Sequence, residues 1–69
     1  LLLLRNGKRI GVEIKYSDAP STTRSMRSAM EDLKLDHLYV AYPGKEDYPL
    51  DKNITVTSLT SILSRIRNH

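Results

Sequence analysis

Two opposite charges, Glu13 and Lys15, stand two residues apart in the otherwise apolar run IGVEIKY, residues 10–16. Side chains two apart on a β-strand project from the same face, so this carboxylate and this ammonium would lie together. A carboxylate oxygen is a ligand that Mg²⁺ prefers, and an ammonium beside it can orient an attacking water or steady a phosphate charge. The pair is therefore a candidate for metal-dependent chemistry. A solvent-facing ion pair on an edge strand would give the same pattern.

A predicted β-hairpin indicates where a second carboxylate would have to stand. Asn6-Gly7 separates two strand-like runs, residues 1–5 and 8–16, and both turn residues accept the positive φ of a type I′ turn. Counting outward from this two-residue loop places Glu13 opposite the position immediately before Leu1. Directly opposed side chains lie about 5 Å apart. An acidic residue at that position would complete a Mg²⁺ site of two carboxylates and one ammonium.

The same alternation predicts which face of the second strand is buried. Val12, Ile14 and Tyr16 are apolar or aromatic and alternate with the charged pair. We therefore expect these three side chains to face the core, and Glu13 and Lys15 to face away from it.

Residues 21–34 are predicted to form a helix after a turn at Ser17–Pro20. Ser21 or Thr22 can serve as its N-cap. One apolar face has helical spacing and consists of Met26, Ala29, Met30 and Leu33. Two basic side chains of the same helix, Arg24 and Arg27, are candidates for contacts with nucleic-acid phosphates. A solvated helix face is the alternative explanation for them.

The second half of the chain predicts two strands and a last helix. His37–Tyr42 is a short, nearly continuous apolar run, as in a strand covered on both faces. Residues 43–53 contain two prolines and a glycine and are predicted to be a loop. Ile54–Thr57 is rich in β-branched residues and predicts a strand. Ser58 can cap a last helix, whose expected buried face is Leu59, Ile62, Leu63 and Ile66.

The predicted element order is therefore β-β-α-β-β-α, an α/β (α+β) fold with a mixed sheet, an N-terminal hairpin and two packing helices. The third strand is expected to run parallel to the second. At 69 residues the chain has room for a single domain, residues 1–69. Because it opens in the middle of a predicted strand, we expect a fragment of a longer protein, truncated at its N-terminal end.

Composition narrows the function classes only a little. The chain has no cysteine, so a disulfide or a thiolate metal site is excluded, which fits a reducing, cytoplasmic setting. Its formal net charge of +3 is compatible with nucleic acid and also with an ordinary solvated surface. The four leucines at the start are too few for a membrane span, which needs about 20 residues, so we expect no membrane association.

Taken together, GKRIGVEIKYSDAPS, the basic amphipathic helix and LYVAYPG resemble the PD-(D/E)XK nuclease-like superfamily. More closely, nearly the whole chain is similar to the C-terminal domain of unknown function that follows the nucleotide-binding domain in a family of prokaryotic AAA-type ATPases. The resemblance implies a restriction-endonuclease-like fold. It also implies that an acid on one strand and Glu-x-Lys on the next bind metal and activate water. Glu13 and Lys15 match the second element.

Two functions follow from the resemblance. In the first, the intact protein is a Mg²⁺-dependent endonuclease-type hydrolase of DNA, with Glu13 as metal ligand and Lys15 positioning water. Residues 1–69 alone would then be inactive. In the second, the domain is a catalytically inactive module that binds nucleic acid or protein for the ATPase domain of the same chain. A structural cap on the ATPase is a third reading. We expect no metal requirement for folding in any case, because the hairpin and helix faces supply the core.

Overall fold

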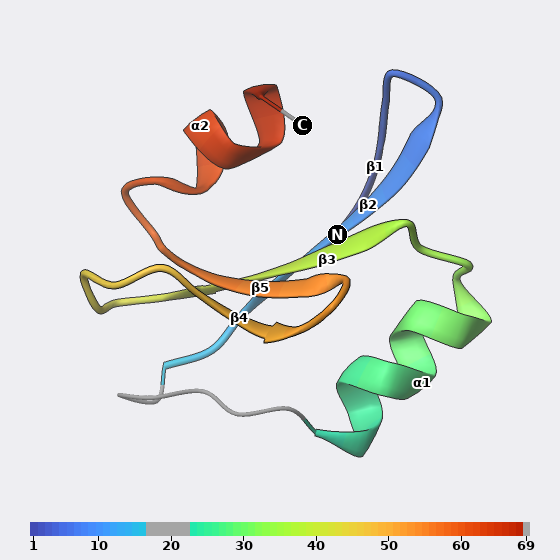
Figure 1. The fold of residues 1–69 in the computed structure, drawn as a ribbon, viewed down its shortest axis with the longest axis horizontal. Helices are drawn as coiled ribbons and strands as arrows, with labels where there is room; N and C mark the ends of the chain where they lie inside the picture. Colours follow the sequence, from blue (N-terminus) through green and yellow to red (C-terminus); the bar gives the residue numbers. More distant parts are fainter. Residues whose placement is uncertain (17–22, 69) are drawn as a thin grey trace.

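A computed structural model describes residues 1–16 and 23–68, and it is an α+β fold with one five-stranded mixed sheet and a helix on each side (Figure 1). The strand order is β1-β2-β3-β5-β4. Strands β2, β3 and β5 run parallel, and β1 and β4 lie antiparallel at the two edges. The elements are β1 (Leu2–Arg5), β2 (Lys8–Ile14), α1 (Arg24–Asp32), β3 (His37–Tyr42), β4 (Tyr48–Asp51), β5 (Ile54–Ser58) and α2 (Ile62–Arg67).

The N-terminal hairpin has the predicted turn and the predicted register. Asn6 and Gly7 have φ values of 52° and 79°, as a type I′ turn requires. Arg5 pairs with Lys8, and the ladder continues outward to a Leu1–Val12 pair joined by two backbone hydrogen bonds of 2.8 and 3.1 Å. The parallel pairing of β2 with β3 is also confirmed.

The main core lies between the sheet and α1. Its buried cluster consists of Met26, Leu35, Leu38, Val40, Tyr42, Ile54 and Val56. Gly11 belongs to this face, because a Cβ placed there would lie 2.6 Å from Leu35 Cδ1 and 3.1 Å from Leu38 Cδ1. The absence of a side chain at Gly11 therefore lets these two leucines pack directly onto β2.

The predicted burial of β2 is wrong at its carboxyl end. Ile14 is 51% exposed and Tyr16 is 81% exposed, and Val12 is only half-buried. Strand alternation fails to predict burial here because both faces of β2 are packed near its centre, where Ile10 and Gly11 are buried. On the face opposite α1, neither helix covers the carboxyl end of β2. Glu13 and Lys15 alternate with these residues and therefore lie on the face that α1 covers.

Helix α1 is shorter than predicted and begins at Arg24. Thr23 is its N-cap, and its hydroxyl accepts the backbone N–H of Met26 at 3.2 Å. The predicted turn at 17–20 and the predicted caps at 21 and 22 lie outside the described residues. The predicted apolar face is confirmed at Met26, which is buried. Ala29 and Met30 on the same face are half-buried.

The helix ends in a Schellman-type turn. The Leu35 N–H bonds to the Met30 carbonyl at 3.0 Å across Lys34, whose φ is 51°. A lysine therefore occupies a left-handed position that favours glycine. Leu33, predicted to be buried, is 45% exposed at this turn.

Strand β4 lies inside the segment predicted to be a loop. The prolines of this segment argue against regular structure, but β4 is an edge strand, where a residue without an N–H, such as Pro49, is tolerated. The register shifts between Pro49 and Asp51, which marks a bulge. Tyr48 and Leu50 pack against the core cluster.

The last helix starts later than predicted and packs less. Ser58 ends β5 rather than capping a helix, and α2 begins at Ile62. No residue of α2 is buried, and Leu63 is 70% exposed. The apolar spacing of this segment therefore does not correspond to a buried helix face among the described residues. Neither α1 nor α2 is long and apolar enough to cross a membrane.

Candidate functional site

The Glu13 side chain lies on the α1 side of the sheet, beside the apolar core. Its Cα pairs with that of Val40, which is fully buried. The carboxylate borders a hollow of about 150 Å³ whose other lining residues are Leu1, Gly11, Val12, Ala29, Leu33, Leu35 and Leu38. Among the described residues of this lining, Glu13 has the only ionisable side chain. A carboxylate is thus held in an apolar setting, where it is poorly solvated.

One oxygen of this carboxylate has no partner. Glu13 Oε2 is buried and makes no hydrogen bond with the described residues. A buried carboxylate oxygen without a hydrogen bond costs about 1–3 kcal/mol or more. A cation bound at this oxygen would offset that cost.

Lys15 follows the end of β2 and continues its ladder with β3. Its backbone N–H donates to the Ala41 carbonyl at 2.9 Å. The strand alternation that places Glu13 towards α1 assigns Lys15 to the same side. The structure shows no ion pair between the two side chains. Within residues 1–16 and 23–68, no group of three or more His, Cys, Asp or Glu side chains is arranged to hold a metal ion. The described residues therefore supply one acidic ligand, not a complete centre.

The two candidate nucleic-acid contacts on α1 lie elsewhere. Arg24 is exposed at the first position of the helix. Arg27 lines a different hollow of about 250 Å³, between α1 and the β4–β5 turn. There its guanidinium is 4.0 Å from Asp51, and both side chains are largely exposed. The lining also includes Glu31, so this surface carries both signs of charge.

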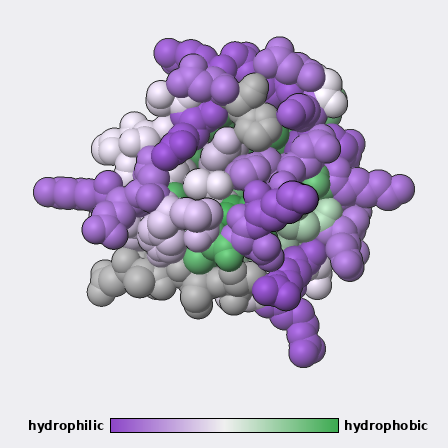
Figure 2. Space-filling model, viewed as in Figure 1, coloured by the Kyte–Doolittle hydropathy of each residue, from purple (hydrophilic) through white to green (hydrophobic). Residues whose placement is uncertain are grey.

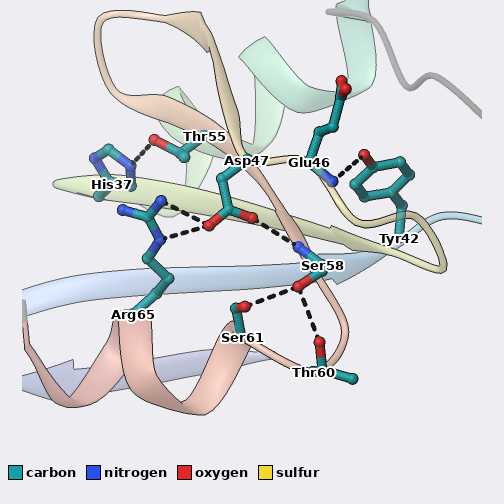
Figure 3. A network of polar contacts seen from close by, with 9 residues as sticks. All are labelled: His37, Tyr42, Glu46, Asp47, Thr55, Ser58, Thr60, Ser61 and Arg65. Carbon is teal, nitrogen blue, oxygen red and sulfur yellow. Dashed lines mark hydrogen bonds and ion pairs between the residues drawn. The ribbon is translucent and has the colours of Figure 1, made fainter.

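A polar network that the sequence patterns did not predict joins α2 to the sheet (Figure 3). Asp47 Oδ2 accepts two hydrogen bonds from Arg65, at 2.7 Å from Nη2 and 3.1 Å from Nε. Asp47 Oδ1 accepts the Ser58 N–H at 3.0 Å, and the Ser58 hydroxyl bonds that of Ser61 at 2.8 Å. The Ser58 hydroxyl bonds side chains, those of Thr60 and Ser61, and caps no backbone N–H among the described residues. The pairing of residues 47 and 65 has no local sequence signal, because they are far apart in the chain.

Two groups near Arg65 have shifted pKa values. The guanidinium of Arg65 holds the pKa of the Asp47 carboxyl below its usual value, and the Ser58 N–H acts in the same direction. Burial raises the pKa of the Tyr39 phenol on the same face of the sheet, although the charge of Arg65 opposes this. This arrangement fastens α2 to the sheet, and a separate pair in the same view joins His37 Nε2 to the Thr55 hydroxyl at 2.8 Å.

Comparison with known proteins places the chain in a family. The sequence profile of a domain of unknown function, DUF4143, matches residues 1–62. The chain belongs to the DUF4143 family. It is 41% identical over 59 residues to the uncharacterized proteins Mb2031c of Mycobacterium bovis and Rv2008c of Mycobacterium tuberculosis. No solved structure is significantly similar to it.

The match to the mycobacterial proteins covers 86% of this chain and 13% of each of theirs. This DUF4143 chain therefore spans about an eighth of the length of the curated relatives it matches. The expected membership in a domain family of unknown function with prokaryotic relatives is confirmed. The nuclease-like assignment of the DUF4143 domain remains a prediction.

Proposed function

We propose that this DUF4143 domain is a nuclease-like domain in which Glu13 binds Mg²⁺ for the hydrolysis of DNA phosphodiester bonds by the intact protein. One observation carries the proposal: Oε2 of Glu13 is buried and accepts no hydrogen bond from the described residues, and Glu13 lines a hollow. A bound cation is one partner that would compensate this carboxylate oxygen for the lost water, and oxygen ligands suit Mg²⁺.

The chain's own residues have distinct tasks in this proposal. Glu13 holds one coordination position, and its apolar surroundings restrict the water around it. Lys15 is two residues after Glu13 on the same side of the sheet, where its ammonium can orient a water or neutralise a phosphate oxygen. Bound Mg²⁺ would polarise the phosphate and lower the pKa of a bound water.

The topology supports the nuclease-like reading. In the resembling superfamily, Glu-x-Lys stands on the strand that follows the one carrying the first acid, and here Glu13 and Lys15 lie at the end of β2, antiparallel to β1. The confirmed register extends β1 so that the position before Leu1 is opposite Glu13. We propose an acidic residue at that position as the second ligand.

The larger context is also a proposal. Because the match covers only 13% of each mycobacterial relative, most of a protein of that kind lies outside this domain. We propose that the domain is the C-terminal part of a prokaryotic AAA-type ATPase acting in the cytoplasm. Its partners would then be the ATPase domain of the same chain and DNA.

A second candidate is a nuclease-like fold without catalysis, serving as a nucleic-acid- or protein-binding module for the ATPase. The observation that favours it is the single acidic ligand among the described residues, since no three candidate ligands come together there. The two candidates differ in one respect that can be measured, namely Mg²⁺-dependent cleavage.

The test is cleavage of supercoiled plasmid DNA by the full-length natural protein, in the presence of Mg²⁺ or of EDTA. We expect Mg²⁺-dependent nicking that falls to background in Glu13→Gln and in Lys15→Met. Glu31→Gln is the matched control, because it removes an exposed carboxylate of α1. Unchanged cleavage in Glu13→Gln would refute the proposed role of Glu13. DNA binding without any cleavage would favour the binding module.

A further inference from the structure

The charges of this chain are not spread evenly over the molecule. Two segments, the hairpin tip at residues 5–9 and helix α2, are joined where Arg5 Nη2 donates to the Arg67 carbonyl at 2.7 Å. Together they carry five cations: Arg5, Lys8, Arg9, Arg65 and Arg67. We call this the basic end of the molecule.

Among the described residues, two acids contact the basic end. Asp36 Oδ2 accepts the Arg9 backbone N–H at 2.7 Å, and Asp47 binds Arg65 at 2.7 Å. The rest of the chain holds six cations and six acids, which balance. The whole formal net charge of +3 therefore belongs to the basic end.

Three of its cations remain available. Arg5 and Lys8 are directly opposed in the β1–β2 ladder, so they share a face, and Arg5 reaches the backbone carbonyl of Arg67. All three residues are exposed, and none forms an ion pair with the acids of the described residues. The Arg5 contact uses one of five guanidinium donors and leaves the others free.

The shape of this end fits a nucleic acid better than a lipid surface. The hairpin projects past the rest of the sheet, with α2 beside it (Figure 1). The upper edge in Figure 2, where Figure 1 draws α2 and the hairpin tip, is mainly hydrophilic. The tip sequence Arg5-Asn6-Gly7-Lys8 has no apolar side chain to insert into a bilayer. A two-stranded β-ribbon with cations at its tip can enter the major groove of duplex DNA.

We propose that the basic end is a docking surface for the phosphate backbone of duplex DNA, through Arg5, Lys8 and Arg67. This inference builds on the nucleic-acid part of the proposed function but does not require cleavage. It assigns DNA contact to the hairpin and α2, whereas the mixed charges around Arg27 make the α1 surface a weaker anion site.

The test is fluorescence anisotropy of labelled duplex DNA with the full chain in EDTA, from about 50 to 200 mM salt. The variant is Lys8→Gln/Arg67→Gln, which leaves the Arg67 carbonyl in place to accept from Arg5. The matched control is Lys45→Gln/Lys52→Gln, which removes the same charge from exposed positions elsewhere. Circular dichroism verifies that both variants fold.

We expect the basic-end variant to bind about tenfold more weakly at low salt, with a salt slope smaller by about two. The control should stay within about twofold of the unsubstituted protein. Equal losses in both variants would mean that net charge alone acts, and would overturn the inference. So would an absence of DNA binding, or binding to phosphatidylserine vesicles in place of DNA.

The two proposals fail separately in these experiments. If Mg²⁺-dependent cleavage is lost in Glu13→Gln but the basic-end variant binds DNA normally, the docking surface is wrong and the metal site stands. If the basic-end variant loses binding while no cleavage is detected, the docking surface stands and the hydrolytic function falls.

Discussion

At the scale of single residues, Glu13 is held at a cost that a purely structural role does not explain. Its buried oxygen Oε2 accepts no hydrogen bond within residues 1–16 and 23–68, and its described neighbours in the hollow are apolar. Methionine has about the length of glutamate and no charge to desolvate. We therefore expect Glu13→Met to raise the stability of the metal-free protein by about 1–3 kcal/mol, measured by urea unfolding in EDTA.

A control isolates the effect of the buried oxygen. Glu31→Met replaces an exposed carboxylate of α1 and is expected to change stability by less than about 0.5 kcal/mol. If Glu13→Met proved destabilising, the carboxylate would have a partner that stabilises it, and the basis for a cation at this position would be lost.

At Gly11, the close packing of Leu35 explains why the residue has no side chain. An added Cβ would lie 2.6 Å from Leu35 Cδ1, so the leucine must move. We expect Gly11→Ala to destabilise the fold by about 1–2 kcal/mol in denaturant unfolding.

The physical cause can be separated by a double-mutant cycle. Leu35→Ala removes the clashing methyl groups and leaves space for the new one. The two substitutions together should then cost about 1 kcal/mol less than the sum of the single ones. Strict additivity would show that Leu35 is not what excludes a side chain at Gly11.

At the scale of elements, local signals were sufficient where the chain makes its own turn. The pair Asn6-Gly7 has the two positive φ values of a type I′ loop, and the loop then sets every pair of the β1–β2 ladder. The apolar run of β3 was predicted as covered on both faces, and five of its six residues are buried. These features depend on neighbours in sequence.

The missed features depend on partners far along the chain. Pro49 is compatible with β4 only because β4 is an edge strand, which no local pattern reveals. Ser58 ends β5 and its N–H bonds Asp47, a partner that no local pattern reveals, and α2 begins only at Ile62. The same holds for the site. The spacing of the sequence predicts Glu13 and Lys15, but the hollow beside Glu13 also depends on Ala29, Leu35 and Leu38, which lie far along the chain.

The end of α1 offers a prediction about backbone strain. Lys34 has a φ of 51°, a conformation that costs a residue with a Cβ about 1 kcal/mol. We expect Lys34→Gly to stabilise the fold by about 0.5–1 kcal/mol in thermal unfolding. Lys45→Gly, at an exposed position without positive φ, should give no gain. A loss of stability in Lys34→Gly would contradict the strain at this turn.

The attachment of α2 predicts a pH dependence. Because Arg65 lowers the pKa of Asp47, the pair stabilises the fold above the ordinary value of 3.8 and loses this effect as pH falls through the lowered value. Both side chains are partly exposed, so we expect Asp47→Asn to cost about 1 kcal/mol at pH 7. The difference from the unsubstituted protein should vanish in acid.

Asp51→Asn is the matched comparison for that pair. It removes the 4.0 Å contact with Arg27, in which the side chains are 68% and 49% exposed. We expect less than about 0.5 kcal/mol at any pH. Equal effects of the two substitutions would indicate that Asp47 does not fasten α2 more strongly than an ordinary surface pair.

At the scale of the whole molecule, the two proposed surfaces are separate. Glu13 lies under α1 on one face of the sheet, whereas Arg5 and Arg67 join the hairpin to α2 on the other. A domain that uses both would hold DNA at its basic end and present a phosphate towards the end of β2. Curated relatives extend far beyond the matched part, so other domains of such a protein can complete both surfaces.

The central claim is that Glu13 binds a divalent cation, and the most direct test is the thermal unfolding midpoint of the full chain with and without Mg²⁺. A ligand that binds only the folded state raises this midpoint. We predict a saturable rise on adding Mg²⁺ to the unsubstituted protein and none in Glu13→Gln. An equal rise in both proteins, or no rise in either, would contradict the account.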